Sequence, residues 1–310
     1  MQNNLILRLS NGLGNQLFMY ASAFAIAKKL NRNLLIDNET AFESKKNIST
    51  YDLKDFNISS SIAPDSLKFK NYNGYIFRKI LKRLDFFKKK KSFFIENKNK
   101  NKISYFSESF LNYNLASNVF LEGHFETEKY FNKFKHDIKK ELSFRDNITS
   151  IKSNLIHQIS NSNSVCICIR QGRFNEELKE KNNLSKINQS WAFTLEQINY
   201  TLKSVEILKR KLDNPKFFLW SNDFTNLNKY FPTNEFVMVN NVVNNNYIFD
   251  LYLMTLARHY IVAPTSFNWW GAWLSHNSEN SLVLRPSEKL FSDFFLNNKD
   301  FWPSAWQIVI

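Results

Sequence analysis

The chain has 310 residues and is 43% hydrophobic, with thirty phenylalanines, so it can bury the cores of two domains and is not a disordered protein. Its formal charge of +14 favours an anionic ligand, such as nucleic acid, an acidic membrane surface or a phosphorylated substrate. No basic segment followed by an apolar core opens the sequence, and no apolar run reaches the roughly 18 residues of a membrane-spanning helix. We therefore expect a cytoplasmic protein without a signal peptide.

The first residues predict a strand, a tight turn and a helix. Leu5–Ser10 is apolar enough for a buried strand, and Gly12 and Gly14 form the turn. The helix that follows has apolar residues at helical spacing, with Asn15 as its expected N-cap. Asn33–Asp37 is the next strand, and this β-α-β order predicts that the two strands are parallel.

The region from Ser44 to Asn118 is polar and rich in lysine, and it predicts helices and loops without clear boundaries. Within it, the segment Arg78–Phe94 (RKILKRLDFFKKKKSFF) has two interpretations. It is either a solvated charged surface or a basic, aromatic-flanked patch that rests on an anionic membrane. Val119–Phe131 then predicts a strand followed by a turn and a helix.

Strands and helices alternate regularly after residue 150. The expected strands are Val165–Arg170, Lys216–Asp223, Phe236–Asn240, Tyr260–Ala263 and Ser281–Pro286. The expected helices are Ser190–Leu212, with Ser190 as its cap, Asn246–His259 and Ser266–His276. This alternation predicts a doubly wound α/β fold, with domains at residues 1–150 and 151–310. Cys166 and Cys168 share one face of a strand and have no Cys or His neighbours in sequence, so no metal site is expected.

Polar residues follow three strands of the second domain, where the ligand of an open α/β sheet is expected. They are Arg170–Arg173, Ser221–Asp223 and Pro264–Ser266. An arginine at the end of an apolar strand suits a phosphate, although an ion pair with a neighbouring aspartate is the alternative. Ser266 begins a helix, so its hydroxyl and the first N–H groups suit an anion, unless it is an ordinary cap. Asp250, on the preceding helix, is a candidate for contacts to a base or a solvated side chain.

Two common nucleotide motifs fit the sequence poorly. The segment SNGLGNQ has Leu17 where a dinucleotide-binding G-x-G-x-x-G needs its third glycine, although Asp37 ends the second strand as a dehydrogenase would require. A P-loop is excluded because no Gly-Lys-Ser/Thr follows the glycines.

Four segments together resemble one known family: GLGNQLFMYASAFAIA, LEGHFETEKYF, FFLWSND and YIVAPTSFNWWGAWLS. They resemble, in the same order and from residue 8 to about 286, the bacterial α-1,2-fucosyltransferases of glycosyltransferase family 11. The resemblance implies a GT-B fold with two Rossmann-like domains facing a cleft. It also implies an inverting reaction without a metal or other cofactor, in which GDP-β-L-fucose is the donor substrate.

The resemblance also assigns donor-site residues. It implies that Arg170 grips the donor diphosphate, that Thr265 and Ser266, followed by Phe267, hold its β-phosphate, and that Asp250 reads guanine. The remaining donor-site candidates lie on neighbouring loops. They are Gly12, Gly14, Asn15 and Gln16 on the first loop, and Arg173, Asn222 and Asp223 on loops that follow strands of the second domain.

The sequence departs from the family's H-x-R-R-x-D motif, where it reads Cys168-Ile169-Arg170-Gln171-Gly172-Arg173. Only the diphosphate arginine is kept, and Arg173 is expected to replace the lost positive charge. This departure leaves the identity of the donor sugar open. The first candidates for a catalytic base are Glu176 and Glu177, and His124 and Glu126 are the second; a packing or surface role is the alternative for each.

The leading hypothesis, which the resemblance implies, is an α-1,2-fucosyltransferase that acts on a galactose-like residue of a surface glycan, such as an O-antigen, or of its lipid-linked precursor. A transferase for another GDP-sugar is the second hypothesis, and a nucleic-acid-binding protein, suggested by the charge alone, is the third. Peripheral contact with the inner membrane is also expected. Trp269, Trp270 and Trp273 are expected to be core residues rather than a platform for a sugar.

Overall fold

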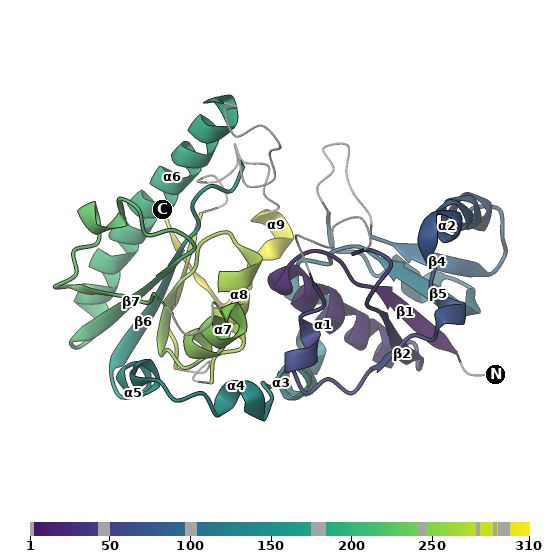
Figure 1. The fold of residues 1–310 in the computed structure, drawn as a ribbon, viewed down its shortest axis with the longest axis horizontal. Coiled ribbons are helices and arrows are strands. Elements are labelled where there is room, and N and C mark those ends of the chain that lie inside the picture. Colours follow the sequence, from purple (N-terminus) through teal and green to yellow (C-terminus); the bar gives the residue numbers. More distant parts are fainter. Residues whose placement is uncertain are drawn as a thin grey trace. The chain divides into compact units, whose positions relative to one another are not determined.

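The computed structural model describes residues 3–42, 50–96, 104–174, 184–240, 246–276, 280–287, 290 and 298–310. The chain divides into two compact units (Figure 1). Unit 1 comprises Met1–Arg145 and Lys299–Pro303, and unit 2 comprises Asp146–Asn298 and Ser304–Ile310. The segment Lys299–Pro303, which the sequence analysis assigned to the second domain, thus belongs to unit 1.

Unit 1 contains a parallel five-stranded sheet in the order β3-β2-β1-β5-β4. The strands are β1 (Asn4–Arg8), β2 (Asn33–Asp37), β3 (Ser61–Ile62), β4 (Lys91–Ile95) and β5 (Leu115–Glu122). The chain moves outward from β1 to β3, then returns on the other side of β1. The topological switch point of this sheet therefore lies between β1 and β5.

The helices of unit 1 confirm the β-α-β opening and correct its cap. They are α1 (Leu13–Lys29), α2 (Asn71–Asp85) and α3 (Lys135–Glu141). Short 3-10 helices lie at Leu53–Asp55, Asp65–Leu67, Ser109–Asn112, Glu128–Tyr130 and Asn132–Phe134. The prediction that Asn15 caps α1 is wrong, because Gly12 is the N-cap and makes no side-chain bond there. Asn15 instead lies in the first turn, and its amide N–H donates to the Gly12 carbonyl.

Unit 2 contains a parallel six-stranded sheet in the order β11-β10-β9-β6-β7-β8. The strands are β6 (Asn163–Ile169), β7 (Pro215–Ser221), β8 (Phe236–Met238), β9 (His259–Ile261), β10 (Val283–Pro286) and β11 (Gln307–Val309). Read from the first strand outward, this is the strand order of a Rossmann fold. Its topological switch point lies between β6 and β9.

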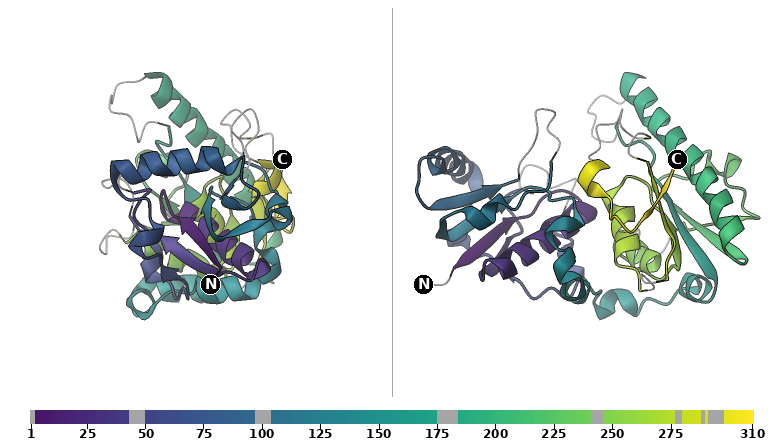
Figure 2. Two further views of the ribbon diagram at one scale, coloured as in Figure 1. Left: turned by 90° about the vertical axis from the view of Figure 1, so that its right-hand side faces the viewer. Right: turned by 180° about the vertical axis from the view of Figure 1, so that it is seen from behind.

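The helices of unit 2 cover both faces of its sheet, as a doubly wound fold requires. They are α4 (Asp146–Thr149), α5 (Asn154–Ser160), α6 (Leu184–Lys211), α7 (Tyr247–Thr255) and α8 (Ser266–Trp273). The short α9 (Asn298–Phe301) follows at the point where the chain returns to unit 1. Helix α6 lies on one side of the strands and α7 and α8 on the other (Figures 1 and 2).

Helix α6 starts six residues before the predicted cap Ser190. Ser190 lies inside the helix, is buried, and its hydroxyl accepts from the Phe174 amide at 3.0 Å. The prediction that the tryptophans are core residues is confirmed. Trp269 and Trp270 are fully buried, and Trp273 stacks on Trp269 with ring centroids 6.0 Å apart. These buried rings pack on one another and on Trp306, which anchors α8 in the core of unit 2.

Candidate functional site

The loops after β6 and β9 meet at the switch point of unit 2. Arg170 directly follows β6, and the segment Pro264–Ser266 follows β9 and leads into α8. Because β6 and β9 are parallel neighbours, their carboxyl ends lie at the same edge of the sheet. A direct contact joins the two loops, since the Arg173 guanidinium donates to the Pro264 carbonyl at 2.8 Å. Arg173 also lies over the Phe193 ring, 5.2 Å from its centroid.

A buried glutamine of α6 holds the backbone of Arg170. The Gln197 side chain is fully buried, and its oxygen accepts from the Arg170 amide at 3.0 Å while its nitrogen donates to the Arg170 carbonyl at 2.8 Å. Both bonds constrain the peptide units on either side of the arginine. The sequence analysis missed this role, although a glutamine at an inward position of an apolar helix face was a signal for it.

Two side-chain hydrogen bonds, made by Thr265 and Asn268, fix the N-terminus of α8. Thr265 is the N-cap, and its hydroxyl accepts from the Asn268 amide at 3.4 Å. The Asn268 side chain is fully buried, and its oxygen accepts from the Ala263 amide at 2.7 Å. Ser266 and Phe267 form the half-buried first turn, so the helix presents its positive end at the sheet edge that carries Arg170.

Asp250 on α7 is electrostatically close to the end of β6. Burial raises the pKa of the partly buried Cys168 thiol to about 12; the Arg170 guanidinium opposes this shift and the Asp250 carboxylate adds to it. Both charged groups therefore act on the thiol of one residue of β6. Asn246 caps α7 through bonds to the Ile248 and Phe249 amides, which fixes the turn that carries Asp250.

Asn222 and Asp223 form hydrogen bonds that connect the loops after β6 and β7. The Asn222 side chain accepts from the Gln171 amide at 2.9 Å and donates to its carbonyl at 3.1 Å. The Thr225 hydroxyl and amide donate to the Asp223 carboxylate, which lowers the pKa of Asp223. The side-chain Nε2 of Gln171 in turn donates to the Asp223 and Thr225 carbonyls. The loops after β6 and β7 are thus tied together.

The switch point of unit 1 brings together the loops after β1 and β5. Asn11, with a left-handed φ of 63°, places its side-chain nitrogen 2.7 Å from His124 Nε2. Gly12 is exposed, and a Cβ built on it would meet no atom within 4 Å. Glu126, the other second-choice base, is half-buried on the same loop as His124. The loop of Asn11 and Gly12, which leads into α1, and the loop of His124 therefore meet at one edge of unit 1.

The loop that carries His124 is held by a buried carboxylate. Glu96 follows β4, and its two oxygens accept from the His124 and Phe125 amides at 2.9 and 2.8 Å. Burial raises the pKa of Glu96, and the bond from the His124 amide partly opposes this shift. Gly123 allows this close approach, because a Cβ on it would lie 2.3 Å from the Glu96 Cβ. Sequence reasoning did not identify Glu96, whose partners lie 28 and 29 residues away along the chain.

Two predicted residues of the first loop have structural roles in unit 1. Gln16 is fully buried, and its amide nitrogen donates to the Asn11 and Thr50 carbonyls while its oxygen accepts from the Asp52 amide. It therefore fixes the loop from inside the unit. Gly14 is buried as the second residue of α1.

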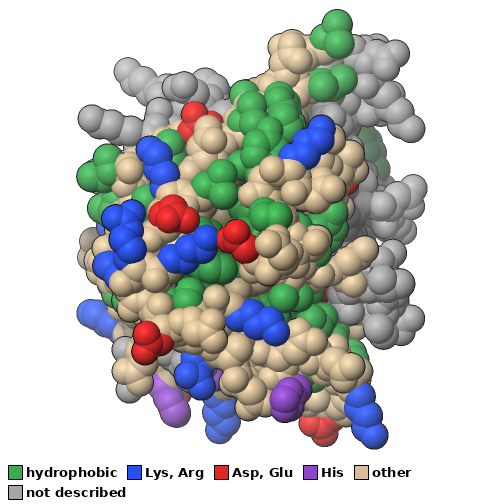
Figure 3. Space-filling model, turned by 90° about the vertical axis from the view of Figure 1, so that its left-hand side faces the viewer, with side chains coloured by type: hydrophobic (Ala, Val, Ile, Leu, Met, Phe, Trp, Pro, Cys, Tyr) green, Lys and Arg blue, Asp and Glu red, His purple; other side chains and the backbone are tan. Residues whose placement is uncertain are grey.

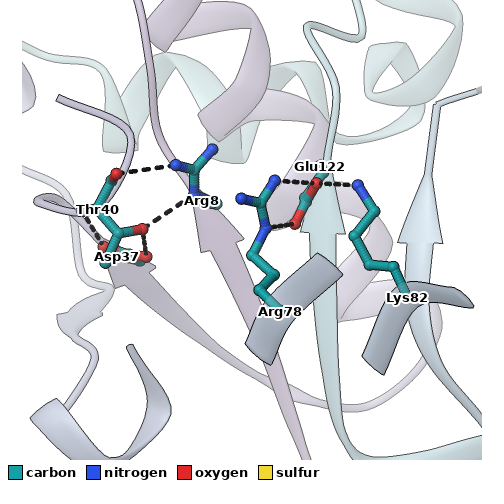
Figure 4. Close-up of polar contacts among 6 residues, drawn as sticks. All are labelled: Arg8, Asp37, Thr40, Arg78, Lys82 and Glu122. Atoms are coloured by element: carbon teal, nitrogen blue, oxygen red, sulfur yellow. Dashed lines mark hydrogen bonds and ion pairs between the residues drawn. The ribbon is translucent and has the colours of Figure 1, made fainter. Parts of the chain in front are cut away.

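Asp37, which had kept a dehydrogenase in consideration, is also used internally. It is 2% exposed, and its carboxylate accepts from the Glu39 and Thr40 amides and from the Thr40 hydroxyl. Arg8 at the end of β1 also donates to Thr40 (Figure 4). Asp37 therefore stabilises the turn after β2, and Arg8 ties this turn to β1.

Glu176 and Glu177 lie outside the described residues, as does the whole segment 175–183. Among the residues that the structure describes, no three His, Cys, Asp or Glu side chains are grouped as a metal site would require. Within the same ranges, none of the helices has the length and apolar character needed to cross a membrane.

Two parallel Rossmann-like sheets, each with loops gathered at a switch point, define an α/β protein of the GT-B class, and solved structures support this. A NodZ α-1,6-fucosyltransferase soaked with GDP-fucose aligns with a TM-score of 0.50 at 14% identity, covering 89% of this chain and 93% of that one. A mutant of Arabidopsis thaliana FUT1 in complex with GDP aligns with a TM-score of 0.53 at 13% identity, covering 98% and 75%. At these identities the likeness concerns the fold.

The family is shown by the sequence itself. The chain matches the family model described as Glycosyl transferase family 11 over residues 4–308, and it belongs to this family. It is 27% identical to an Escherichia coli alpha-1,2-colitosyltransferase, with 97% of each chain covered. It is 23% identical to the E. coli O-antigen biosynthesis glycosyltransferase WbnK, with 90% and 92% covered. The protein is thus a fucosyltransferase-like glycosyltransferase.

Proposed function

We propose that this enzyme transfers L-fucose from GDP-β-L-fucose to a galactose-like hydroxyl of a surface glycan or its precursor, forming an α-1,2 linkage with inversion. The observation that carries the proposal is the meeting of Arg170 and the α8 N-terminus at the switch point of unit 2. An open α/β sheet binds its ligand at this point, and both groups suit a diphosphate.

Asp250 is the residue that we propose recognises the guanine base of the donor. A carboxylate can accept from guanine N1–H and N2–H₂ together, which neither uracil nor adenine can supply in the same pattern. Asp250 and Arg170 both act electrostatically on Cys168, which supports a base and a diphosphate bound along one sheet edge. GDP-fucose bound to the NodZ structure and GDP bound to FUT1 are compatible with this assignment.

The chemistry that these residues supply is electrostatic. As the glycosidic bond breaks, negative charge grows on the β-phosphate, and Arg170 with the first turn of α8 would stabilise it. The sugar carbon becomes oxocarbenium-like, and an acceptor hydroxyl attacks from the opposite face. No metal is needed in this scheme, so activity should persist in EDTA. Glu176 and Glu177 remain the first candidates for a base, followed by His124 and Glu126.

GDP-colitose is an alternative donor, which the departure from the family's H-x-R-R-x-D motif favours. The segment Cys168–Arg173 replaces three charged or polar residues of the family motif, and the relative that covers 97% of the chain is named for colitose rather than fucose. Colitose differs from fucose by one missing hydroxyl group. A site that lacks the polar partners of that hydroxyl would accept GDP-colitose as readily.

The setting of the reaction belongs to the same proposal. WbnK is named for O-antigen biosynthesis, so an O-antigen precursor is the acceptor class we propose. We also propose that the enzyme works in the cytoplasm at the inner membrane, which cell fractionation would test. The alternative of a nucleic-acid-binding protein has less support: on the face drawn in Figure 3, described Lys and Arg side chains are interspersed with Asp and Glu rather than gathered in one stripe.

The decisive experiment combines a donor comparison with variants. Purified enzyme is supplied with GDP-fucose, GDP-colitose or GDP-mannose and a panel of galactose-terminated acceptors, and GDP release and linkage are measured by NMR. Arg170→Ala should lower transfer by about 1000-fold, while Arg210→Ala, an exposed arginine on α6, should leave it unchanged. Full activity of Arg170→Ala, with the fold intact by circular dichroism, would contradict the diphosphate site. Glu176→Gln and Glu177→Gln test the base in the same assay.

A further inference from the structure

Helix α2 has charged side chains on its inward side and apolar side chains on its outward side, the reverse of an ordinary surface helix. Its inward side carries charge: Arg78 and Lys82 both bind Glu122 at the end of β5, with N–O distances of 2.6 to 2.9 Å (Figure 4). Asp85 is buried and accepts from the Ser92 and Phe93 amides. Charged side chains thus attach this side of the helix to β5 through ion pairs and to β4 through hydrogen bonds.

The outward side of α2 carries the apolar residues. Ile76, Ile80 and Leu84 are spaced four apart, so they form one stripe, and they are 37, 48 and 49% exposed. Phe77, beside this stripe, is 55% exposed and also contacts the Phe69 ring. An exposed apolar stripe on a helix of a water-facing surface is unfavourable unless something covers it.

The turn after α2 extends this surface. Phe86 and Phe87 are 80 and 82% exposed, and their rings contact each other edge to face at 5.3 Å. The Lys91 ammonium donates to the Asp85 and Phe86 carbonyls, so the turn has a defined conformation. Three exposed lysines, at 88–90, follow the two rings directly. Apolar rings therefore stand beside a cluster of positive charge.

We propose that α2 and this turn, residues 71–90, form a surface that docks on an anionic lipid bilayer. The segment has seven Lys and Arg residues against one Asp, and five of the seven remain besides Arg78 and Lys82, which bind Glu122. Aliphatic and aromatic side chains can enter the boundary of the acyl chains while lysines reach the phosphate groups beside them. Nucleic acid matches the charge and not the aliphatic stripe. The docking does not depend on the proposed transfer; its consequence, a lipid-linked acceptor, rests on the proposed function.

The test is a vesicle flotation assay with the full chain and no sugar substrate. We expect binding to vesicles of phosphatidylcholine with phosphatidylglycerol and much weaker binding to phosphatidylcholine alone. Ile80→Glu with Phe86→Ser and Phe87→Ser should lower the partition coefficient by about 100-fold. Lys88→Gln with Lys89→Gln and Lys90→Gln should lower it by a similar factor, and added salt should weaken wild-type binding.

Matched controls separate this surface from general charge and hydrophobicity. Ile310→Ser removes an apolar side chain that is 96% exposed elsewhere, and Lys152→Gln with Lys203→Gln and Lys229→Gln removes three other exposed charges. Both controls should bind vesicles as the wild type does. Equal binding by the α2 variants, or no wild-type binding to anionic vesicles, would overturn the proposal. A change in oligomeric mass without a change in vesicle binding would assign the surface to a second copy instead. Transfer to a soluble acceptor should persist in every variant, so this result is independent of the proposed function.

Discussion

Asn11 and His124 join the two loops at the switch point of unit 1, with Asn11 Nδ2 2.7 Å from His124 Nε2. An amide nitrogen only donates, so in this orientation Nε2 accepts and the imidazole carries its proton on Nδ1. The contact holds the ring beside exposed Gly12 and fixes its tautomer. It gives a physical reason to test His124 as a group that faces the acceptor.

We expect His124→Ala to lower kcat for transfer by about 100-fold if the ring assists the acceptor hydroxyl. Asn11→Gly removes the contact and suits the left-handed φ, so it should lower kcat by about tenfold without loss of stability. Asn11→Ala removes the same contact and should also cost about 1 kcal/mol of unfolding free energy because of its backbone conformation. Steady-state kinetics and urea denaturation measure these effects. Wild-type kcat in all three variants would show that His124 only packs.

Substitution by alanine should lower the stability of the protein at Gly123 but not at Gly12. Gly123→Ala places a Cβ 2.3 Å from the Glu96 Cβ at a φ of 155°, so we expect a loss of about 2 to 4 kcal/mol of stability. Gly12→Ala meets no atom within 4 Å and has a φ of −77°, so stability should change by less than about 0.5 kcal/mol. If the donor or the acceptor approaches Gly12, the KM of the Gly12→Ala variant for that substrate should nevertheless rise. Unchanged stability in Gly123→Ala, or an unchanged KM in Gly12→Ala, would contradict the respective role.

The pH dependence of stability should report on Glu122. Burial alone would raise the pKa of this carboxylate, but Arg78 and Lys82 outweigh it, and the net shift is downward from the ordinary 4.5. The unfolded state thus binds the proton more readily, so the stabilisation is complete above about pH 4.5 and disappears as the pH falls through the folded-state pKa.

Glu122→Gln should therefore cost about 2 kcal/mol near pH 7 and progressively less in acid. Urea denaturation at several pH values measures the difference from the wild type. Glu206→Gln is a suitable control, because its pair with Lys209 is exposed and should contribute less than about 0.5 kcal/mol. A difference between wild type and Glu122→Gln that stays constant from neutral to acid pH would show that the ion pairs do not stabilise α2.

The sequence predicted the alternation of strands and helices because each buried strand and amphipathic helix has a local pattern. It also indicated which strand ends carry polar groups. It failed at the starts of α1 and α6, where Asn15 and Ser190 follow the local rule for caps but the helices begin earlier. At α1, the buried Leu13 and Gly14 precede Asn15, and their packing outweighs a capping preference of about 1 kcal/mol. The residues of α6 before Ser190 are exposed or half-buried, and nothing in the structure explains that earlier start.

The supporting residues could not be predicted for a different reason. Gln197, Glu96 and Gln16 hold backbone groups that lie far away along the chain, and such pairings are set by the tertiary fold. A single sequence shows only that polar residues stand in apolar surroundings. It does not show their partners. The sides of α2 could not be predicted either, since the sequence analysis set no helix boundaries in this region and Glu122 lies about 40 residues further along the chain.

Asp250 offers the sharpest test of the nucleotide. If its carboxylate accepts from both guanine N–H groups, wild-type enzyme should bind GDP about tenfold more tightly than inosine diphosphate, which lacks the 2-amino group. Asp250→Asn should weaken GDP binding by about 100-fold, and its ratio of GDP to inosine diphosphate affinity should approach one, because the amide nitrogen cannot accept. Calorimetry with the two nucleotides measures both ratios, and Asp213→Asn, an exposed aspartate between α6 and β7, should match the wild type. Equal affinity of the wild type for both nucleotides would remove Asp250 from the base site, while the roles of Arg170 and Ser266 at the diphosphate would stand on their own variants.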